Sequence, residues 1–111
     1  MTAQLFAQLS EELTASRPDV EPTRMVGSAG LNTHAKTFAM LVRRRLVVKL
    51  PSERVQELLA AGTGGRFDPG HGRLMREWIS RAASTDPTTC RMLMAETLRF
   101  VGAALASGGG G

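Results

Sequence analysis

The sequence TFAMLVRRRLVVKL at residues 37–50 constrains the fold more than any other stretch of the chain. Apolar residues alternate with other side chains on both sides of three consecutive arginines, a pattern that predicts a β-hairpin with one buried face. In this register Val42 lies opposite Leu46. The six apolar residues that share the buried face are Phe38, Met40, Val42, Leu46, Val48 and Leu50. The register also predicts a three-residue loop at Arg43–Arg45, which places three guanidinium groups at the hairpin tip.

The two predicted hairpin turns lack glycine, which tight turns usually place in the left-handed backbone conformation. In the three-residue loop, Arg45 would adopt that conformation at a cost of about 1 kcal/mol. An arginine at such a position is either tolerated by the fold or retained for binding. A second turn at His34 and Ala35 would set Leu31 opposite Phe38, although a longer loop fits the same residues.

Three other segments have the apolar spacing of amphipathic helices. The first covers residues 3–15, and residues 16–23, which contain two prolines, are expected to form a loop after it. A central helix is predicted between an N-cap at Ser52 and a terminating Gly62. Asp86 followed by proline is typical of a helix start, and it predicts a C-terminal helix over residues 87–106.

Two more strands are predicted, at residues 25–33 and residues 74–81. The first is weakened by two glycines. The second is apolar on both faces, so one face must meet the core and the other a helix or a partner. Its two faces are Leu74 with Trp78 and Met75 with Ile79. The segment 63–73 is expected to be a loop, with Phe67 as an apolar anchor and a type II turn at Pro69–Gly70.

The composition restricts the class and environment of the protein. The 111 residues are expected to form one α+β domain over 1–106, followed by a disordered glycine-rich tail at 107–111. Cys90 is the single cysteine, which excludes an internal disulfide and fits a reducing compartment. The N-terminus lacks the features of a signal peptide, and no apolar run reaches the ~18 residues that span a bilayer. We therefore expect a cytoplasmic protein without membrane contact.

The net charge of +4 is unevenly distributed along the chain. Residues 1–21 hold one base and four acids (−3), residues 22–52 hold six bases and no acid (+6), and the remainder holds seven bases and six acids (+1). The six bases of the middle block are Arg24, Lys36, Arg43, Arg44, Arg45 and Lys49. The block predicts contacts with phosphate or with an acidic partner, and a solvated sheet edge that resists aggregation gives the same pattern.

Asp68 and His71 lie three residues apart in a glycine-rich turn, a spacing at which a carboxylate can orient an imidazole. Cys90 is the candidate nucleophile for such a pair, but nothing in the sequence links it to this turn. Turn capping by Asp68, a surface position for His71 and burial of Cys90 explain the same residues without chemistry. His34 has no neighbour suited to metal binding. We therefore predict no catalytic, cofactor-binding or metal-ligating residue.

Three segments together carry a family resemblance: RMVGSAGLNTHAKTFAML, RRRLVVKLPSERVQELLAAG and RFDPGHGRLMREW, within residues 24–100. They resemble the TfoX N-terminal-like domain, a bacterial family of small α+β proteins related in fold to the YjbR group. The resemblance implies a curved antiparallel sheet with an N-terminal, a central and a long C-terminal helix. It implies no catalytic residues. Where the family usually has glycine-containing turns, this chain has His34–Ala35 and Arg43–Arg45 instead.

The same resemblance implies little about function. The name-giving members are regulators of natural competence, which carry a second, C-terminal domain with features of DNA binding. This chain resembles the stand-alone members, which have no assigned activity, so a role in competence is not implied.

Three functions are consistent with the sequence. The first is a non-enzymatic regulatory or adaptor domain that binds a protein partner, or itself, through Leu74 and Trp78. The second is a nucleic-acid-binding protein that contacts phosphates through the six bases of the middle block. The third is an enzyme that uses Asp68, His71 or Cys90.

Overall fold

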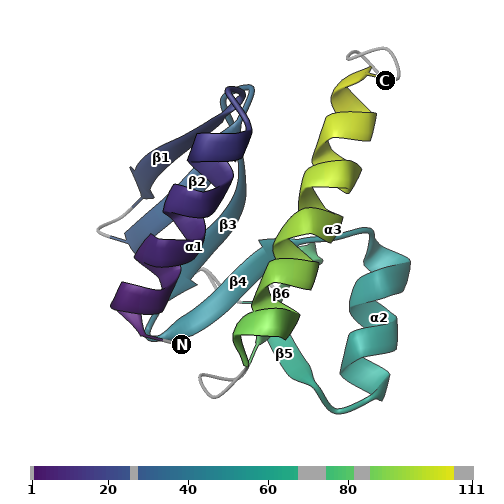
Figure 1. The fold of residues 1–111 in the computed structure, drawn as a ribbon. Coiled ribbons are helices and arrows are strands. Elements are labelled where there is room, and N and C mark those ends of the chain that lie inside the picture. Colours follow the sequence, from purple (N-terminus) through teal and green to yellow (C-terminus); the bar gives the residue numbers. More distant parts are fainter. Residues whose placement is uncertain (1, 26–27, 68–74, 82–85, 107–111) are drawn as a thin grey trace.

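The computed structural model describes residues 2–25, 28–67, 75–81 and 86–106. Along the chain the elements are α1 (Ala3–Ser16), β1 (Val20–Met25), β2 (Ser28–Thr33), β3 (Lys36–Val42), β4 (Arg45–Lys49), α2 (Ser52–Ala60), β5 (Gly64–Phe67), β6 (Met75–Arg81) and α3 (Pro87–Ala106). The strands form one antiparallel sheet in the order β1-β2-β3-β4-β6-β5 (Figure 1). The predicted α+β class, with N-terminal, central and C-terminal helices, is confirmed. Within the described residues, no helix has the length and hydrophobicity that a bilayer span requires.

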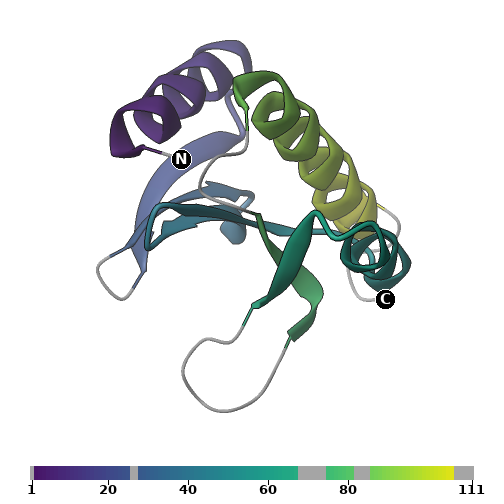
Figure 2. The same cartoon turned by 90° about the horizontal axis from the view of Figure 1, so that it is seen from below.

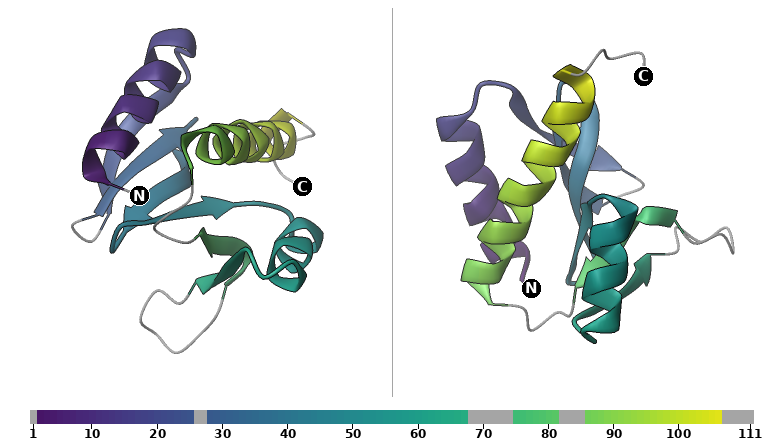
Figure 3. Two further views of the ribbon diagram at one scale, coloured as in Figure 1. Left: turned by 60° about the horizontal axis from the view of Figure 1, so that its bottom comes forward. Right: turned by 90° about the vertical axis from the view of Figure 1, so that its right-hand side faces the viewer.

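The helices pack on one side of the sheet. Figure 2 shows α1 and α3 over the same side of the strands, and Figure 3 shows α2 beside the β5–β6 hairpin. All three helices contribute side chains to one main core, which includes Leu9 of α1, Val55 of α2 and Leu98 of α3. The same core contains Leu46 and Ile79 from the centre of the sheet. Burial of this apolar surface is the main favourable term in folding.

Both hairpin turns contain two residues, and each of those residues has a positive φ. The values are 49° and 65° for His34 and Ala35, and 52° and 65° for Arg43 and Arg44. A two-residue turn of this kind matches the right-handed twist of the strands that it joins. The predicted three-residue loop is therefore wrong, because Arg45 is the first residue of β4. The left-handed conformation falls on Arg43 and Arg44 instead.

A β-bulge interrupts the pairing of β2 with β3. Leu31 pairs with Ala39 and Asn32 pairs with Thr37, so Phe38 has no partner of its own. The predicted pair of Leu31 with Phe38 is therefore wrong. A bulge places two residues of one strand opposite one residue of the other, and it shifts the alternation of side chains beyond it.

The bulge divides the apolar residues of the central hairpin between two faces. Phe38 and Ala39 both belong to the main core, whereas Met40 and Val42 belong to a second cluster with Val47. The prediction of one shared face is therefore wrong. The predicted residues that do face the main core are Phe38, Leu46, Val48 and Leu50. The register of β3 with β4 is displaced by one residue from the predicted one, so that Met40 pairs with Val47.

Two strands were not expected from the sequence. The predicted loop 16–23 continues as β1 from Val20, so that the predicted strand 25–33 is in fact the second arm of a hairpin. Pro22 is compatible with β1 because this strand lies at the edge of the sheet, where a missing N–H is tolerated. The predicted loop 63–73 begins with β5, which ends at Phe67. The predicted turn at Pro69–Gly70 lies outside the described residues.

Most of the helix ends lie where the sequence predicts them. Asp86 caps α3, accepting hydrogen bonds from the backbone N–H and the hydroxyl of Thr89. At the end of α2, Gly62 has a φ of 71° and donates to the carbonyl of Leu59, as in a Schellman motif. The predicted N-cap at Ser52 is wrong, because Pro51 takes that position and no side chain caps the helix. The end of the first helix, at Ser16, lies one residue beyond the predicted one.

Thr97 connects α3 to the strands beneath it. Its side chain is fully buried on the sheet-facing side of the helix. The hydroxyl donates a hydrogen bond to the carbonyl of Lys49 and lies 3.4 Å from the carbonyl oxygen of Phe38, the bulge residue. A buried carbonyl that loses its donor keeps its desolvation cost, so this hydroxyl stabilises the helix–sheet contact.

Replacement of Thr97 by valine keeps the shape of the side chain and removes the donor. We expect Thr97→Val to lower the free energy of unfolding by about 1–3 kcal/mol, measured by urea denaturation. Thr88→Val, at an exposed position of the same helix, should change it by less than about 0.5 kcal/mol. Equal stability of the two variants would show that the hydroxyl contributes nothing.

Candidate functional site

The face of the sheet opposite the main core carries a second apolar cluster, and we refer to it as the helix-free face. Its buried residues are Met40, Val47 and Trp78, and Val42 and Phe67 pack against them while partly exposed. The rings of Phe67 and Trp78 lie 6.3 Å apart at an interplanar angle of 52°. This distance is within the range of favourable aromatic pairs. The cluster joins the β5–β6 hairpin to the centre of the sheet.

A row of paired residues crosses this face from one edge strand to the other. In the order of the strands it contains Thr23, Gly30, Met40, Val47, Ser80 and Gly65. A Cβ atom added at Gly30 would lie 3.1 Å from the carbonyl oxygen of Ala39, 3.2 Å from Cγ2 of Thr23 and 3.4 Å from Cγ of Met40. An added Cβ would thus crowd the Ala39 carbonyl and the Thr23 methyl group, so the glycine permits the close approach of the two neighbouring strands at this point.

Trp78, a predicted partner residue, lies on the helix-free face of β6, and only 8% of it is exposed. Val47, at the centre of the cluster, is 1% exposed. The side chains that a partner can reach are therefore those at the rim, Val42 and Phe67, which are half-buried. Leu74, the other predicted partner residue, lies outside the described residues.

Strand β4 adds positive charge to the same face. Arg45, Val47 and Lys49 alternate along it, so the three side chains point to one side. The Nε of Arg45 donates a 2.8 Å hydrogen bond to the hydroxyl of Ser80, and Lys49 pairs with Trp78 across the ladder. The apolar cluster thus has a cation at each end of its central strand.

The six bases of the middle block do not gather at one place. Four of them lie at one end of the sheet, which we call the arginine end: Arg24, Arg43, Arg44 and Arg45. Lys36 begins β3 and Lys49 ends β4, so both lie at the opposite end of these antiparallel strands. The sequence block is continuous, but the hairpin folds it back on itself and separates the arginines from the lysines.

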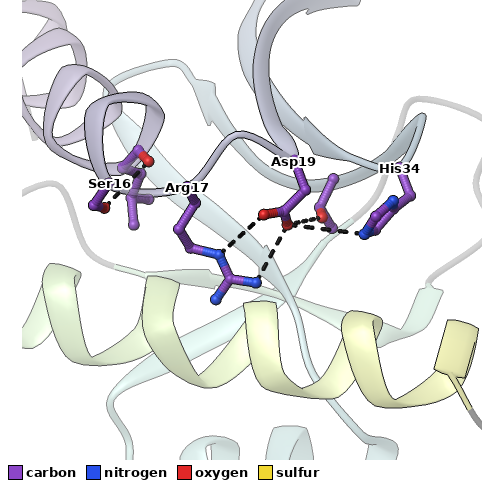
Figure 4. A network of polar contacts seen from close by, with 6 residues as sticks. Ser16, Arg17, Asp19 and His34 are labelled. Atoms are coloured by element: carbon purple, nitrogen blue, oxygen red, sulfur yellow. Dashed lines mark hydrogen bonds and ion pairs between the residues drawn. The ribbon is translucent and has the colours of Figure 1, made fainter.

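Asp19 is the centre of a polar network between the end of α1 and the β2–β3 turn (Figure 4). Its carboxylate accepts hydrogen bonds from the Thr33 hydroxyl at 2.7 Å and from the Arg17 guanidinium at 3.2 Å. The Nε2 of His34 lies 4.0 Å from the same carboxylate. The hydrogen bonds from Thr33 and Arg17 lower the pKa of Asp19 to about 2.

The sequence alone does not predict this network, because Asp19 lies in a segment with the composition of a loop. The only local signal is an acid followed by a strand-like residue. Thr33 lies 14 residues away and is 1% exposed, so the contact depends on the hairpin being formed. The geometry ties the N-terminal helix to the sheet, and the described residues of the network include no group placed as a nucleophile.

The lowered pKa of Asp19 predicts a pH-dependent contribution to stability. The carboxylate stabilises the folded state above pH 4, since its usual pKa is 3.8, and the contribution is lost as pH falls towards about 2. Asp19→Asn should therefore lower the urea midpoint at pH 6, and the difference from the wild type should shrink between pH 4 and pH 2. Thr33→Val should weaken the same pH dependence, because it removes the largest cause of the shift. A difference that stays constant with pH would contradict this account.

The candidate catalytic residues are not brought together in the described part of the chain. Cys90 is buried in the main core, and burial raises the pKa of its thiol. Asp68 and His71 lie outside the described residues. Among the residues that the structure does describe, no group of three or more His, Cys, Asp or Glu side chains is placed to hold a metal ion.

Burial of Cys90 predicts slow thiol chemistry. A neutral, covered thiol is a poor nucleophile, because the thiolate is the reactive form. In the native protein at pH 8 we expect a thiol reagent such as DTNB to react much more slowly than in 8 M urea, where Cys90 is exposed. Cys90→Ser should remove the signal in both conditions. Labelling at the same rate in both would show that the thiol is accessible.

Comparison with known proteins found no match for this chain, whether among family models, curated proteins or solved structures.

Proposed function

We propose that this chain is a non-enzymatic regulatory or adaptor domain of the TfoX N-terminal-like type, which acts by binding a partner protein through its helix-free face. The main support for this proposal is the second apolar cluster on that face. All three described helices contribute to the core on the other side, so none of them covers this cluster.

The charges at the rim favour one kind of partner. Arg45 and Lys49 lie at the two ends of the cluster on β4. No described carboxylate lies within ion-pair distance of either cation. Complementary charge steers association and selects partners. A segment with an apolar side chain between acidic ones therefore fits this face best.

The helical side of the molecule is less suited to binding. Glu12 of α1 pairs with Arg91 of α3, and Arg54 of α2 pairs with Glu96 of α3, so charged side chains there bridge neighbouring helices. Met92 is the only exposed large apolar side chain among the described residues. A lone exposed apolar residue is normal for a soluble surface. Met92 therefore serves as the control position for a test of the helix-free face.

A binding-only function agrees with the state of Cys90, the one candidate catalytic residue within the described part of the chain. The Cys90 thiol is buried and its pKa is raised. The charged groups with the clearest contacts, such as Asp19 and Arg54, are engaged in links between elements of the fold. These contacts have structural roles and need no substrate.

Site-specific photo-crosslinking tests the proposal. We would replace Val42 or Phe67 by p-benzoylphenylalanine, express each variant in a bacterial host and irradiate the cells. Both positions are at the rim of the helix-free face, and Met92 on α3 provides the matched control. We expect discrete crosslinked products from positions 42 and 67, with no such product from position 92.

Mass spectrometry of the products identifies the partner. A product at twice the mass of the chain indicates a second copy, and light scattering should then report a dimer. Products of equal yield from all three positions, or from position 92 alone, would exclude the helix-free face as the binding surface.

A further inference from the structure

We infer that the arginine end of the sheet is a separate site that binds the phosphodiester backbone of a nucleic-acid duplex. It is formed by the β3–β4 turn and by the adjacent ends of β1 and β4. This site shares Arg45 with the rim of the helix-free face and differs in its ligand from the contact proposed there. Four arginines that lie far apart in sequence, at position 24 and at positions 43–45, are brought to one end by the sheet register.

The register places Arg24 close to the turn. Arg24 pairs with Ala29, and in the same ladder Gly30 of β2 pairs with Met40 of β3. Adjacent strands lie about 4.8 Å apart, so β1 and β4 are separated by about 15 Å. A duplex carries one phosphate charge per ~1.7 Å of its axis, so about nine charges lie along that distance. Side chains alternate along a strand, so Arg24, next to Thr23, points to the helical side of the sheet and Arg45 to the helix-free side. A duplex can therefore offer a phosphate to each of the four arginines only if it lies across the end of the sheet.

The positive charge of Arg43 and Arg45 is not neutralised by neighbouring acids in the described part of the chain. Residues 22–52 contain no acid, and no described carboxylate is within ion-pair distance of either side chain. The Nε of Arg45 donates instead to the neutral hydroxyl of Ser80. By contrast, the arginines that link elements of the fold each pair with a carboxylate, namely Arg17, Arg54 and Arg91.

Arg43 and Arg44 are not the residues that best suit the backbone conformation of this turn. Arg43 and Arg44 have φ values of 52° and 65°, which asparagine and glycine adopt at lower cost. His34 and Ala35 have nearly the same values at the other turn. Strain alone therefore does not indicate binding. The two turns differ in charge, and this difference makes them a matched pair for experiment.

The chemistry of the side chains favours a duplex backbone over a single strand. Guanidinium groups bind phosphate oxygens in a bidentate manner. Proteins that bind single strands add exposed aromatic rings on which bases stack. Among the described residues, no aromatic side chain is fully exposed, and Trp78 is only 8% exposed. Contacts to phosphate without base stacking are the arrangement expected for sequence-independent duplex binding.

Fluorescence anisotropy with a fluorescein-labelled DNA duplex of 16 base pairs tests the inference. With four phosphate contacts, the slope of log K against log salt concentration should be about −3.6, and affinity should fall about a hundredfold between 50 mM and 200 mM salt. The same strand without its complement should bind more weakly. A duplex of different sequence should bind equally.

Two double variants remove the same amount of charge from opposite ends of the sheet. Arg43→Asn with Arg44→Gly should reduce the magnitude of the slope by about 1.8. Its urea midpoint should be no lower than that of the wild type, because Asn-Gly suits the turn. Lys36→Gln with Lys49→Gln should leave the slope unchanged. His34→Asn with Ala35→Gly, which alters only the other turn, should also leave binding unchanged.

Several outcomes would overturn the inference. They are an equal loss of slope in the arginine and lysine variants, tighter binding of the single strand than of the duplex, and displacement of the duplex by polyglutamate at equal charge concentration. The first indicates general attraction by net charge, the second a single-strand site and the third a site for acidic protein. Crosslinking at positions 42 and 67 tests the helix-free face independently, so failure of one proposal leaves the other measurable.

Discussion

The structure depends on the β-bulge at Phe38. Without it, regular alternation along β3 would continue from Phe38 to Met40 and Val42 on one face. The additional residue keeps Phe38 and Ala39 together in the main core and sends Met40 and Val42 to the opposite face. The sheet therefore has two apolar faces, one covered by helices and one not. The hydroxyl of Thr97 lies at this point, so that α3 is anchored where the strand is irregular.

The two-faced sheet accounts for the other features of the molecule. The main core holds all three helices on one side, and the second cluster holds the β5–β6 hairpin against the centre of the sheet on the other. Gly30 leaves room for the Ala39 carbonyl and the Thr23 methyl group, which a side chain at this position would crowd. Polar contacts then join the elements at their ends, as Asp19 does between α1 and the β2–β3 hairpin. Apolar packing thus stabilises the centre of the sheet, and polar contacts stabilise the ends of the elements.

The elements with a strong local pattern could be predicted, and those that depend on a partner strand could not. The helices at both ends of the chain and the cap at Asp86 follow from apolar spacing and from short-range hydrogen bonds. Strands β1 and β5 have proline or two glycines, and they exist because a neighbouring strand accepts their hydrogen bonds. For the candidate sites, the basic residues were evident from the sequence. Their separation into an arginine end and a lysine end was not, because it depends on the hairpin register.

By itself, the sequence determined the class of the fold, the central hairpin, the C-terminal helix and the excess of positive charge in residues 22–52. Each is a local property, readable from alternation, capping residues or charge within a short window. Only the tertiary structure decided the bulge at Phe38, the left-handed conformation of Arg43 and Arg44, and the depth at which Trp78 is buried. A shift of one residue in pairing moves every following side chain to the other face, and that shift is set by contacts between strands and helices distant in sequence.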